Sequence, residues 1–327
     1  MRALVPMAEA LEEIGPLPDG VSVELWDARG DPPGGGDGVD LWVPPFPPIP
    51  DYAIPLSKLP QLRVIQMLTA GYDHIRPYVP DGVTLCNAAG VHDGPVAEWV
   101  LAALLAIARR LPAYVHQQVS GSTAREQSDS LIGKTVLIAG YGGIGQAVER
   151  RLAGFEVDVI RVASRAREGV HGPEDLLELL PRADVVVLAL PLSDRTHHLV
   201  NAEFLARLPD GAIVVNAARG AVVDQDALES ELKRERLRAA LDVTTPDPLS
   251  PDDSLRKLPQ LLYTPHVAGA TTLTLPRVFG LVGDQIRRRH AGEPLLNVVA
   301  GPHDLGPAHP AHPAHPAHPA DSGESAS

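Results

Sequence analysis

The stretch Thr135-Val-Leu-Ile-Ala-Gly-Tyr-Gly-Gly-Ile-Gly145 decides the fold, because an apolar run leads directly into glycines spaced G-x-G-x-x-G. A helical pattern follows, and a second apolar run comes at Val157–Val162. Strand, glycine turn, helix and strand form the unit that binds a dinucleotide pyrophosphate at the helix N-terminus. Gly140 permits the tight turn, Gly142 lets the backbone approach the pyrophosphate, and Gly145 lets the helix pack on the strand. The alternative is a glycine turn without a ligand.

Similar apolar runs recur along the chain, most of them nearly continuous. This pattern is typical of strands covered on both faces, and therefore of a parallel sheet with crossover helices. The sequence thus predicts an α/β fold. The expected strands are Val39–Val43, Leu62–Met67, Thr135–Ala139, Val157–Val162, Asp184–Leu190, Ala212–Asn216, Ala239–Val243 and Leu261–Thr264.

The length, net charge and cysteine count of the chain exclude several classes of protein. The 327 residues suggest about two domains at roughly 150 residues each. The net charge of −13 disfavours binding to nucleic acid. A single cysteine, Cys86, excludes an intrachain disulfide and a multi-cysteine metal site, and no secretory signal or membrane span is evident. We expect a cytoplasmic protein without a metal site.

Two further segments have a distinctive composition. The end of the chain repeats Ala-His-Pro four times from Ala308 to Pro319, so residues 302–327 are predicted to be a disordered tail. Its histidines leave weak metal binding as an alternative. A long helix is predicted from Pro95 to about Leu111, with Asp93 as N-cap and Arg109-Arg110 at its C-terminal end. Because most of its faces are apolar, we expect it to pack between domains or between subunits.

The second strand of the dinucleotide unit bears on the choice of cofactor. NAD-binding folds place an acidic residue near the end of this strand to bind the ribose 2′-hydroxyl. This chain has no acid between Arg161 and Arg167, whereas Ser164 and Arg165 suit a 2′-phosphate. We predict that NADP(H) is preferred, with NAD(H) as the alternative. The arginines would otherwise only cover the strand end with solvated charge.

Polar residues follow three later strands, at the edge where open α/β sheets bind ligands. Arg219 comes after one strand, Asp242 and Asp247 after the next, and His266 after the last. An arginine offers a fixed charged fork for an anion, and a histidine is a natural acid or base near neutral pH. Each residue alone has a structural explanation, but their occurrence on successive strand ends indicates one shared site.

With these residues in place, the chain resembles the D-isomer-specific 2-hydroxyacid dehydrogenase family over most of residues 50–300. The resemblance is carried by five features: Thr69–Asp73, Asn87–Val91 leading into Val96–Glu98, the glycine fingerprint, Leu190–Leu192 with Thr196, and the Arg219, Asp242 and His266 segments. It implies two Rossmann-like, doubly wound parallel-sheet domains. The nucleotide domain, 98–268, would be inserted into a smaller flavodoxin-like substrate domain formed by 1–97 and 269–301. It also implies a homodimer joined through helix 95–111.

The resemblance also assigns roles to individual residues. Backbone N–H groups of Ala70, Gly71 and Tyr72 would bind the substrate carboxylate with Arg219 and His266, and Asp242 would hold the nicotinamide carboxamide. Family members usually have a glutamate at position 247. With Asp247, either the backbone lies closer to His266 or the pair is looser. Cofactor contacts are expected from Gly140, Gly142, Gly143, Ile144, Gly145, Ser164, Arg165, Pro191, Thr196, Ala217, Asp242 and Gly269.

The substrate is less determined by the sequence. A small uncharged tail on the 2-oxo acid, as in glyoxylate or hydroxypyruvate, is favoured because no second cation for a phosphate is evident beside Arg219. The alternatives are a phosphoglycerate-, formate- or phosphite-type dehydrogenase, and a non-enzymatic, nucleotide-sensing protein similar to corepressors.

Overall fold

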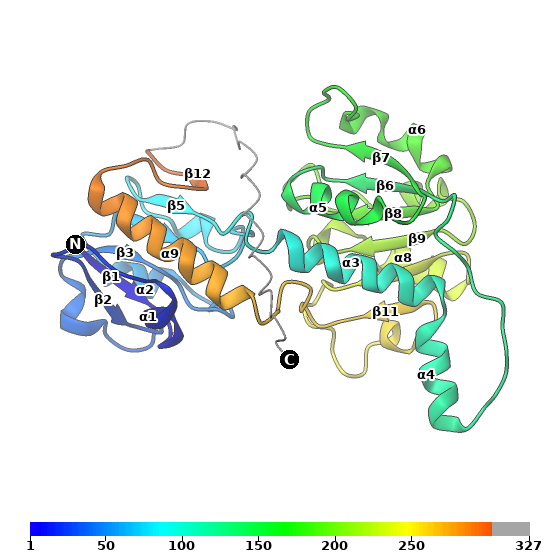
Figure 1. The fold of residues 1–327 in the computed structure, drawn as a ribbon, viewed down its shortest axis with the longest axis horizontal. Helices are drawn as coiled ribbons and strands as arrows, with labels where there is room; N and C mark the ends of the chain where they lie inside the picture. Colours follow the sequence, from blue (N-terminus) through cyan, green and yellow to red (C-terminus); the bar gives the residue numbers. More distant parts are fainter. Residues whose placement is uncertain (303–327) are drawn as a thin grey trace, which may run out of the picture.

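The protein consists of two lobes, each built on its own six-stranded sheet (Figure 1). The computed structural model describes residues 1–302, so the predicted tail lies outside the described residues except for its first position. Within residues 1–302, no helix combines the length and the apolar character that a membrane span requires.

The substrate lobe holds both ends of the described chain. Its strand order is β12-β5-β4-β3-β1-β2, parallel throughout except for β12, which is antiparallel to β5. Helix α9 lies against this sheet (Figure 1), and its Phe279 and Val282 are buried in the core of the lobe. The elements are β1 (Arg2–Val5), α1 (Glu9–Glu13), β2 (Ser22–Leu25), η1 (Pro33–Gly36), β3 (Val39–Trp42), α2 (Ala53–Ser57), β4 (Val64–Gln66), η2 (Arg76–Tyr78), β5 (Thr84–Cys86), α9 (Thr274–Ala291) and β12 (Val298–Ala300).

The nucleotide lobe contains a wholly parallel sheet in the order β11-β10-β9-β8-β6-β7. The chain leaves β6 in one direction to β7 and returns on its other side to β8. Ligands bind at such a switch point, beyond the carboxyl ends of the strands. The elements are α3 (Asp93–Ala108), α4 (Leu111–Ser120), β6 (Thr135–Ala139), α5 (Gly143–Leu152), β7 (Asp158–Val162), η3 (Pro173–Asp175), α6 (Leu176–Leu179), η4 (Leu180–Arg182), β8 (Val185–Leu188), α7 (Ala202–Ala206), β9 (Ile213–Asn216), η5 (Gly220–Val222), α8 (Gln225–Lys233), β10 (Arg238–Leu241), η6 (Ser254–Lys257) and β11 (Leu261–Tyr263).

The two lobes are joined by two chain crossings that lie side by side. One precedes α3 at His92 and the other precedes α9 at Gly269, and a Cβ on Gly269 would lie 3.1 Å from Nδ1 of His92. Along the chain, strands β6 to β11 lie between β5 and β12 of the other lobe, so one lobe is inserted into the other. The precise domain bounds, 97/98 and 268/269, stay a prediction.

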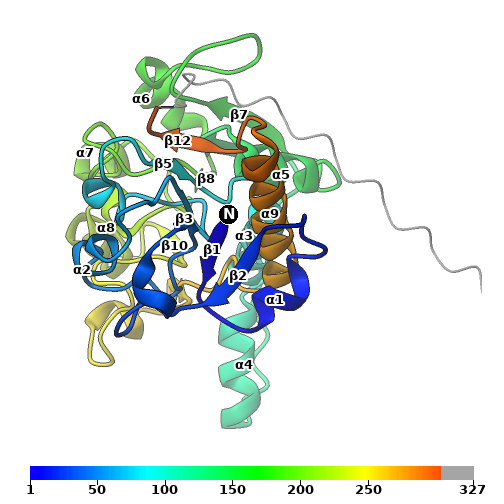
Figure 2. The same cartoon turned by 90° about the vertical axis from the view of Figure 1, so that its left-hand side faces the viewer.

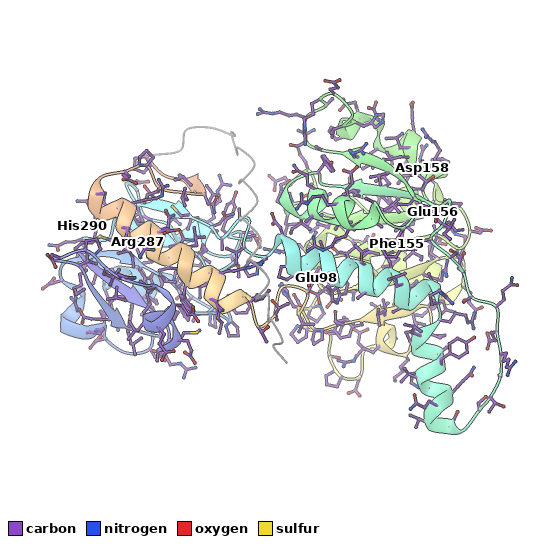
Figure 3. All side chains as sticks on the ribbon, viewed as in Figure 1. Glu98, Phe155, Glu156, Asp158, Arg287 and His290 are labelled. Carbon is purple, nitrogen blue, oxygen red and sulfur yellow. The ribbon has the colours of Figure 1, made fainter. Side chains whose placement is uncertain are left out.

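The predicted long helix is wrong in its bounds. Helix α3 begins at Asp93, so Asp93 lies inside the helix rather than at its N-cap, and it ends at Ala108. Arg110 has φ of 56° and separates it from α4, which runs away from both sheets (Figure 2). The apolar residues of α3 pack against α5 and the strands of its own lobe. Glu98 on α3, labelled in Figure 3, also pairs with Arg151 on α5 at 3.2 Å.

Candidate active site

Three glycines of the fingerprint serve three different steric needs. Gly140 has φ of 103°, and a Cβ there would lie 2.3 Å from the carbonyl oxygen of Ala189. A Cβ on Gly145 would lie 2.2 Å from the carbonyl oxygen of Gly140, whereas a Cβ on Gly142 would meet nothing within 4 Å. Gly142 is also the N-cap of α5 and contributes no side-chain cap. The open face at Gly142 and the start of α5 fit the pyrophosphate of a dinucleotide.

Substitutions at two of these glycines should therefore affect different properties, cofactor binding in one case and stability in the other. Gly142→Ala is expected to leave the melting temperature unchanged and to raise the Kd for NADPH about tenfold, because the added methyl lies where only a ligand would approach. Gly145→Ala is expected to cost about 1–3 kcal/mol of stability through overpacking. Calorimetric binding and thermal melts measure the two effects. Unchanged NADPH binding by Gly142→Ala would show that no pyrophosphate lies against this turn.

The end of β7 carries a charge cluster that the sequence did not reveal. Arg161 donates through Nε to Glu149 on α5 at 3.0 Å, and the Tyr141 hydroxyl donates to the same carboxylate. The hydrogen bond from Arg161 is the main reason that the pKa of Glu149 is lowered. Arg161 is therefore already compensated. Arg165 and Ser164 are exposed, and neither side chain has a hydrogen bond or ion pair within residues 1–302.

Arg219 extends from the end of β9 across to the substrate lobe. The buried amide of Asn216 orients this turn: its Nδ2 donates to the Arg219 carbonyl at 2.9 Å, and its Oδ1 accepts from the Ala218 N–H at 3.0 Å. The Arg219 Nε donates to Oδ1 of Asp73 at 3.2 Å. A Cβ on Gly71 would lie 1.2 Å from Nη2 of Arg219, so the guanidinium rests directly on Gly71.

The loop beneath that guanidinium leaves its amides open. In the described part of the chain, the N–H groups of Ala70, Gly71 and Tyr72 have no hydrogen-bond acceptor. The neighbouring carbonyl oxygens are occupied instead: Thr69 O by the Ala88 N–H (2.9 Å), Ala70 O by Asn87 Nδ2 (2.7 Å) and Gly71 O by Thr69 Oγ1 (2.7 Å). Free amides beside a guanidinium are suited to bind a carboxylate.

His266 follows β11 in a left-handed backbone conformation, with φ of 55°. Its Nδ1 lies 2.8 Å from Oδ2 of Asp247. The shorter aspartate therefore forms a close pair, which corresponds to the closer backbone rather than the looser pair. Because Nδ1 is engaged, Nε2 is the ring nitrogen available for proton transfer.

Asp242 fixes the loop that carries His266. It is 2% exposed, and its carboxylate accepts hydrogen bonds from Thr264 Oγ1 (2.6 Å) and from the N–H groups of Val267 and Ala268 (2.8 Å each). Its backbone carbonyl also accepts from the His266 N–H at 2.7 Å. Such contacts hold a strained backbone in place. Of about four acceptor positions on a carboxylate, one remains, which fits a carboxamide N–H.

The three strand-end loops lie next to one another. Strands β9, β10 and β11 are neighbours in the sheet, and a Cβ on Gly220 would lie 2.0 Å from the Thr244 carbonyl oxygen. The structure thus brings Arg219, Asp247 and His266 to one edge of the sheet. Among residues 1–302, no hydrogen bond joins Arg219 directly to His266; each is held by its own neighbours.

The remaining predicted cofactor residues lie around the same edge. The Thr196 hydroxyl donates to the Pro191 carbonyl at 2.7 Å and accepts from the Ser193 N–H at 2.8 Å, so it closes its own turn. The Ala217 N–H donates to the Leu188 carbonyl at 3.3 Å. A Cβ on Gly143 would meet the carboxylate of Asp93, and Ile144 packs against the core of the lobe.

Sequence reasoning missed Asp73, Asn216 and Thr264. Asn216 had a usable signal, because a buried amide at the carboxyl end of an apolar strand must find partners in the following loop. Asp73 and Thr264 had none, since their partners come from other segments.

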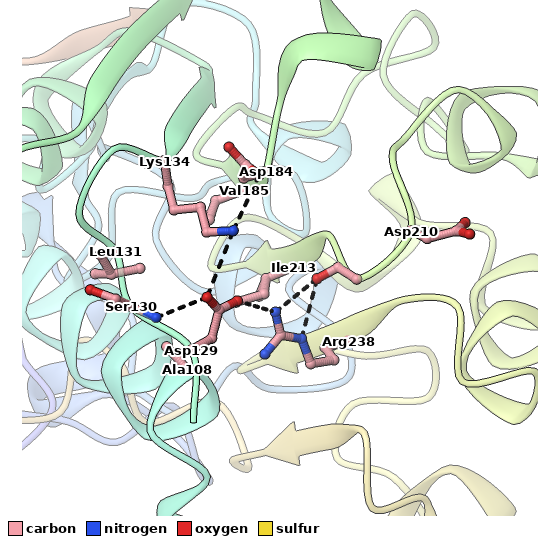
Figure 4. A pocket seen from close by; sticks show the side chains of 11 residues that line it. Ala108, Asp129, Ser130, Leu131, Lys134, Asp184, Val185, Asp210, Ile213 and Arg238 are labelled. Carbon is pink, nitrogen blue, oxygen red and sulfur yellow. Dashed lines mark hydrogen bonds and ion pairs between the residues drawn. The ribbon is translucent and has the colours of Figure 1, made fainter. Parts of the chain in front are cut away.

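A cavity of about 90 Å³ lies at the opposite edge of the nucleotide sheet, where the strands begin (Figure 4). Its charged groups are already paired: Arg238 donates to Asp129 at 3.1 Å, and Lys134 lies between Asp129 and Asp184. Burial would raise the pKa of Asp129, but hydrogen bonds from Ser130 and Arg238 and nearby positive charge outweigh it and lower that pKa. The network ties the chain after α4 to the sheet.

Comparison with known proteins agrees with this geometry. The family described as "D-isomer specific 2-hydroxyacid dehydrogenase, NAD binding domain" matches residues 101–268. The glyoxylate reductase of Korarchaeum cryptofilum (strain OPF8) is 35% identical over 254 residues, which cover 73% of this chain and 76% of that protein. The chain belongs to the D-isomer-specific 2-hydroxyacid dehydrogenase family.

Two further relatives have names that indicate different substrates. The D-3-phosphoglycerate dehydrogenase of Methanocaldococcus jannaschii is 34% identical over 260 residues, covering 76% of this chain but only 49% of that relative. The crystal structure of an NADPH-dependent glyoxylate/hydroxypyruvate reductase from Sinorhizobium meliloti, in complex with NADP and sulfate, has a TM-score of 0.78 at 29% identity, covering 91% of this chain and 96% of that one.

Membership in the 2-hydroxyacid dehydrogenase family confirms three predictions. The two-domain α/β fold with a Rossmann-type nucleotide domain is confirmed, as is the resemblance itself. The chain is an NAD(P)-dependent oxidoreductase acting on 2-hydroxy acids, which favours an enzyme over a non-enzymatic, nucleotide-sensing protein.

Proposed function

We propose that this 2-hydroxyacid dehydrogenase reduces a small 2-oxo acid of the glyoxylate or hydroxypyruvate type, with NADP(H) preferred. The main support for this proposal is the position of the Arg219 guanidinium. It rests on Gly71, beside three backbone N–H groups that have no hydrogen-bond acceptor in the described chain. A carboxylate bound there lies at the sheet edge that also carries His266. The names of the glyoxylate reductase and glyoxylate/hydroxypyruvate reductase relatives support this choice.

Each residue has a chemical task in the proposed reaction. Arg219 and the amides of Ala70, Gly71 and Tyr72 hold the substrate carboxylate, and Arg219 polarises the ketone. His266 donates a proton from Nε2 to the ketone oxygen as it becomes a hydroxyl, and Asp247 stabilises the protonated ring. The nicotinamide supplies the hydride.

The cofactor preference rests on the end of β7. With Arg161 paired to Glu149, the exposed Ser164 and Arg165 are the groups left to bind a 2′-phosphate. The complex of the Sinorhizobium meliloti relative with NADP supports the same choice. The alternative, that these side chains only solvate the strand end, predicts equal use of both cofactors.

A panel of 2-oxo acids against NADPH and NADH tests the proposal. We expect glyoxylate and hydroxypyruvate to give the highest kcat/KM, with NADPH favoured at least about tenfold, or about 1.4 kcal/mol. Preferred reduction of 3-phosphohydroxypyruvate would indicate a phosphoglycerate-type enzyme. Reduction of NADP⁺ by formate or phosphite, without 2-oxo acid turnover, would indicate a formate- or phosphite-type dehydrogenase.

We also propose that the protein is a homodimer. The sequence predicted a dimer contact through helix 95–111, whereas we now propose that the contact is formed by α4. Helix α3 is covered largely by its own lobe, whereas α4 exposes Leu111, Val115 and Val119, spaced four residues apart on one face. Three exposed apolar side chains in one stripe are suited to a contact with a second copy. The molar mass in solution, compared between the parent and Val115→Lys, tests this contact.

A further inference from the structure

Asp73 makes an unusual contact for a surface carboxylate. Its Oδ1 accepts a hydrogen bond from Nε of Arg219, at 3.2 Å, across the two lobes and 146 positions along the chain. Both side chains are partly exposed, at 41% for Asp73 and 28% for Arg219. Exposed ion pairs of this kind add little to stability. The main effect of this contact is therefore on the position of the Arg219 guanidinium rather than on stability.

The contact uses an edge of Arg219 that the substrate does not need. A guanidinium has five N–H groups in a rigid plane. The Nε–H group donates to Asp73, and Nη1 donates to the Ala218 carbonyl at 2.7 Å. Two bonds from different nitrogens fix both the position and the tilt of the plane. Nη2, which rests on Gly71, keeps both of its N–H groups for an anion.

Asp73 is itself held by the turn in which it lies. Ile75 is fully buried, and the N–H groups of Ile75 and Arg76 donate to the Tyr72 carbonyl at 3.2 and 3.1 Å. The His74 ring lies 5.8 Å from the buried Tyr52 ring. Burial is the main reason that the pKa of His74 is lowered, which favours its neutral form. These contacts anchor the turn that presents the Asp73 carboxylate to Arg219.

We propose that Asp73 is a positioning residue for substrate binding. It holds Arg219 from the opposite lobe so that the free N–H groups of the guanidinium stay beside the open amides of Ala70, Gly71 and Tyr72. This inference rests on the proposed function, in which Arg219 binds the carboxylate of a 2-oxo acid. It deepens that function by naming the residue that orients Arg219.

The test compares Asp73→Ala and Asp73→Asn with the parent and with a matched control, Asp81→Asn. Asp81 is exposed in the same lobe, and no hydrogen bond or ion pair involves its side chain in the described structure. We expect Asp73→Ala to raise KM for glyoxylate about tenfold and to weaken oxamate binding to the NADP-loaded enzyme by a similar factor, measured by calorimetry. Asp73→Asn retains an acceptor for the Nε–H group and should fall between Asp73→Ala and the parent. KM for NADPH and the melting temperature should stay at parent values in all three variants.

The outcomes separate the positioning role from the proposed function. Tighter oxamate binding by Asp73→Ala would mean that the carboxylate competes with substrate, and unchanged binding would mean that it has no role; either overturns the positioning proposal. A parallel rise in KM for NADPH would overturn it in favour of a general structural role. A parent enzyme that neither reduces any 2-oxo acid nor binds oxamate would overturn the proposed function instead.

Discussion

Arg219→Lys is expected to lower kcat/KM for glyoxylate by about a thousandfold without unfolding the protein. Loss of one well-placed donor to a developing anion costs about 10²–10³ in rate, and the substitution also removes the planar fork that holds the substrate carboxylate. A lysine keeps the charge, but it cannot donate to Asp73 and Ala218 while also resting on Gly71. Steady-state kinetics at saturating NADPH measure the loss, and KM for NADPH should stay near the parent value.

A second variant, Gly71→Ala, displaces the guanidinium while leaving Arg219 itself in place. A Cβ on Gly71 would lie 1.2 Å from Nη2 of Arg219, so Gly71→Ala must displace the guanidinium and should reduce activity to a similar extent. Arg76→Lys serves as a control, because Arg76 is an exposed arginine after the same loop. If Arg219→Lys keeps activity within about tenfold of the parent, the planar fork is not what binds the substrate.

Features local in sequence were predictable because a single segment determines them. The central strands of the nucleotide lobe, such as Thr135–Ala139, are buried on both faces and appear in the sequence as continuous apolar runs. The structure confirms these strands to within a few residues. Strands β1, β2, β5 and β12, of three or four residues each, were not predicted. The break after α3 had a signal, since Pro112 in the first turn of α4 marks a new helix start.

Features that join distant segments were not predictable from one sequence. The glycine roles follow from a short motif, whereas the pairing of Asp247 with His266 was expected only from the family resemblance, which left its closeness open. The Arg219–Asp73 contact joins the lobes, and the Arg161–Glu149 pair joins strand to helix. The absence of an acid between residues 161 and 167 suggested uncompensated arginines, yet Glu149 on α5 supplies the carboxylate. The pairing of Arg161 leaves the exposed Arg165, which the sequence had already indicated, as the arginine that we propose for a 2′-phosphate.

Asp247→Asn is expected to lower kcat for 2-oxo acid reduction by at least about tenfold and to leave KM for NADPH near the parent value. Reduction needs a proton from Nε2 of His266, and the Asp247 carboxylate, 2.8 Å from Nδ1, holds the ring in place for that transfer. An amide has nearly the same shape as the carboxylate, but it carries no charge to attract the imidazole. Asp247→Glu, which keeps the charge, and Asp252→Asn, an exposed neighbour, serve as controls. Steady-state kinetics with glyoxylate measure the effect, and a kcat equal to that of the parent would show that Asp247 does not act on His266.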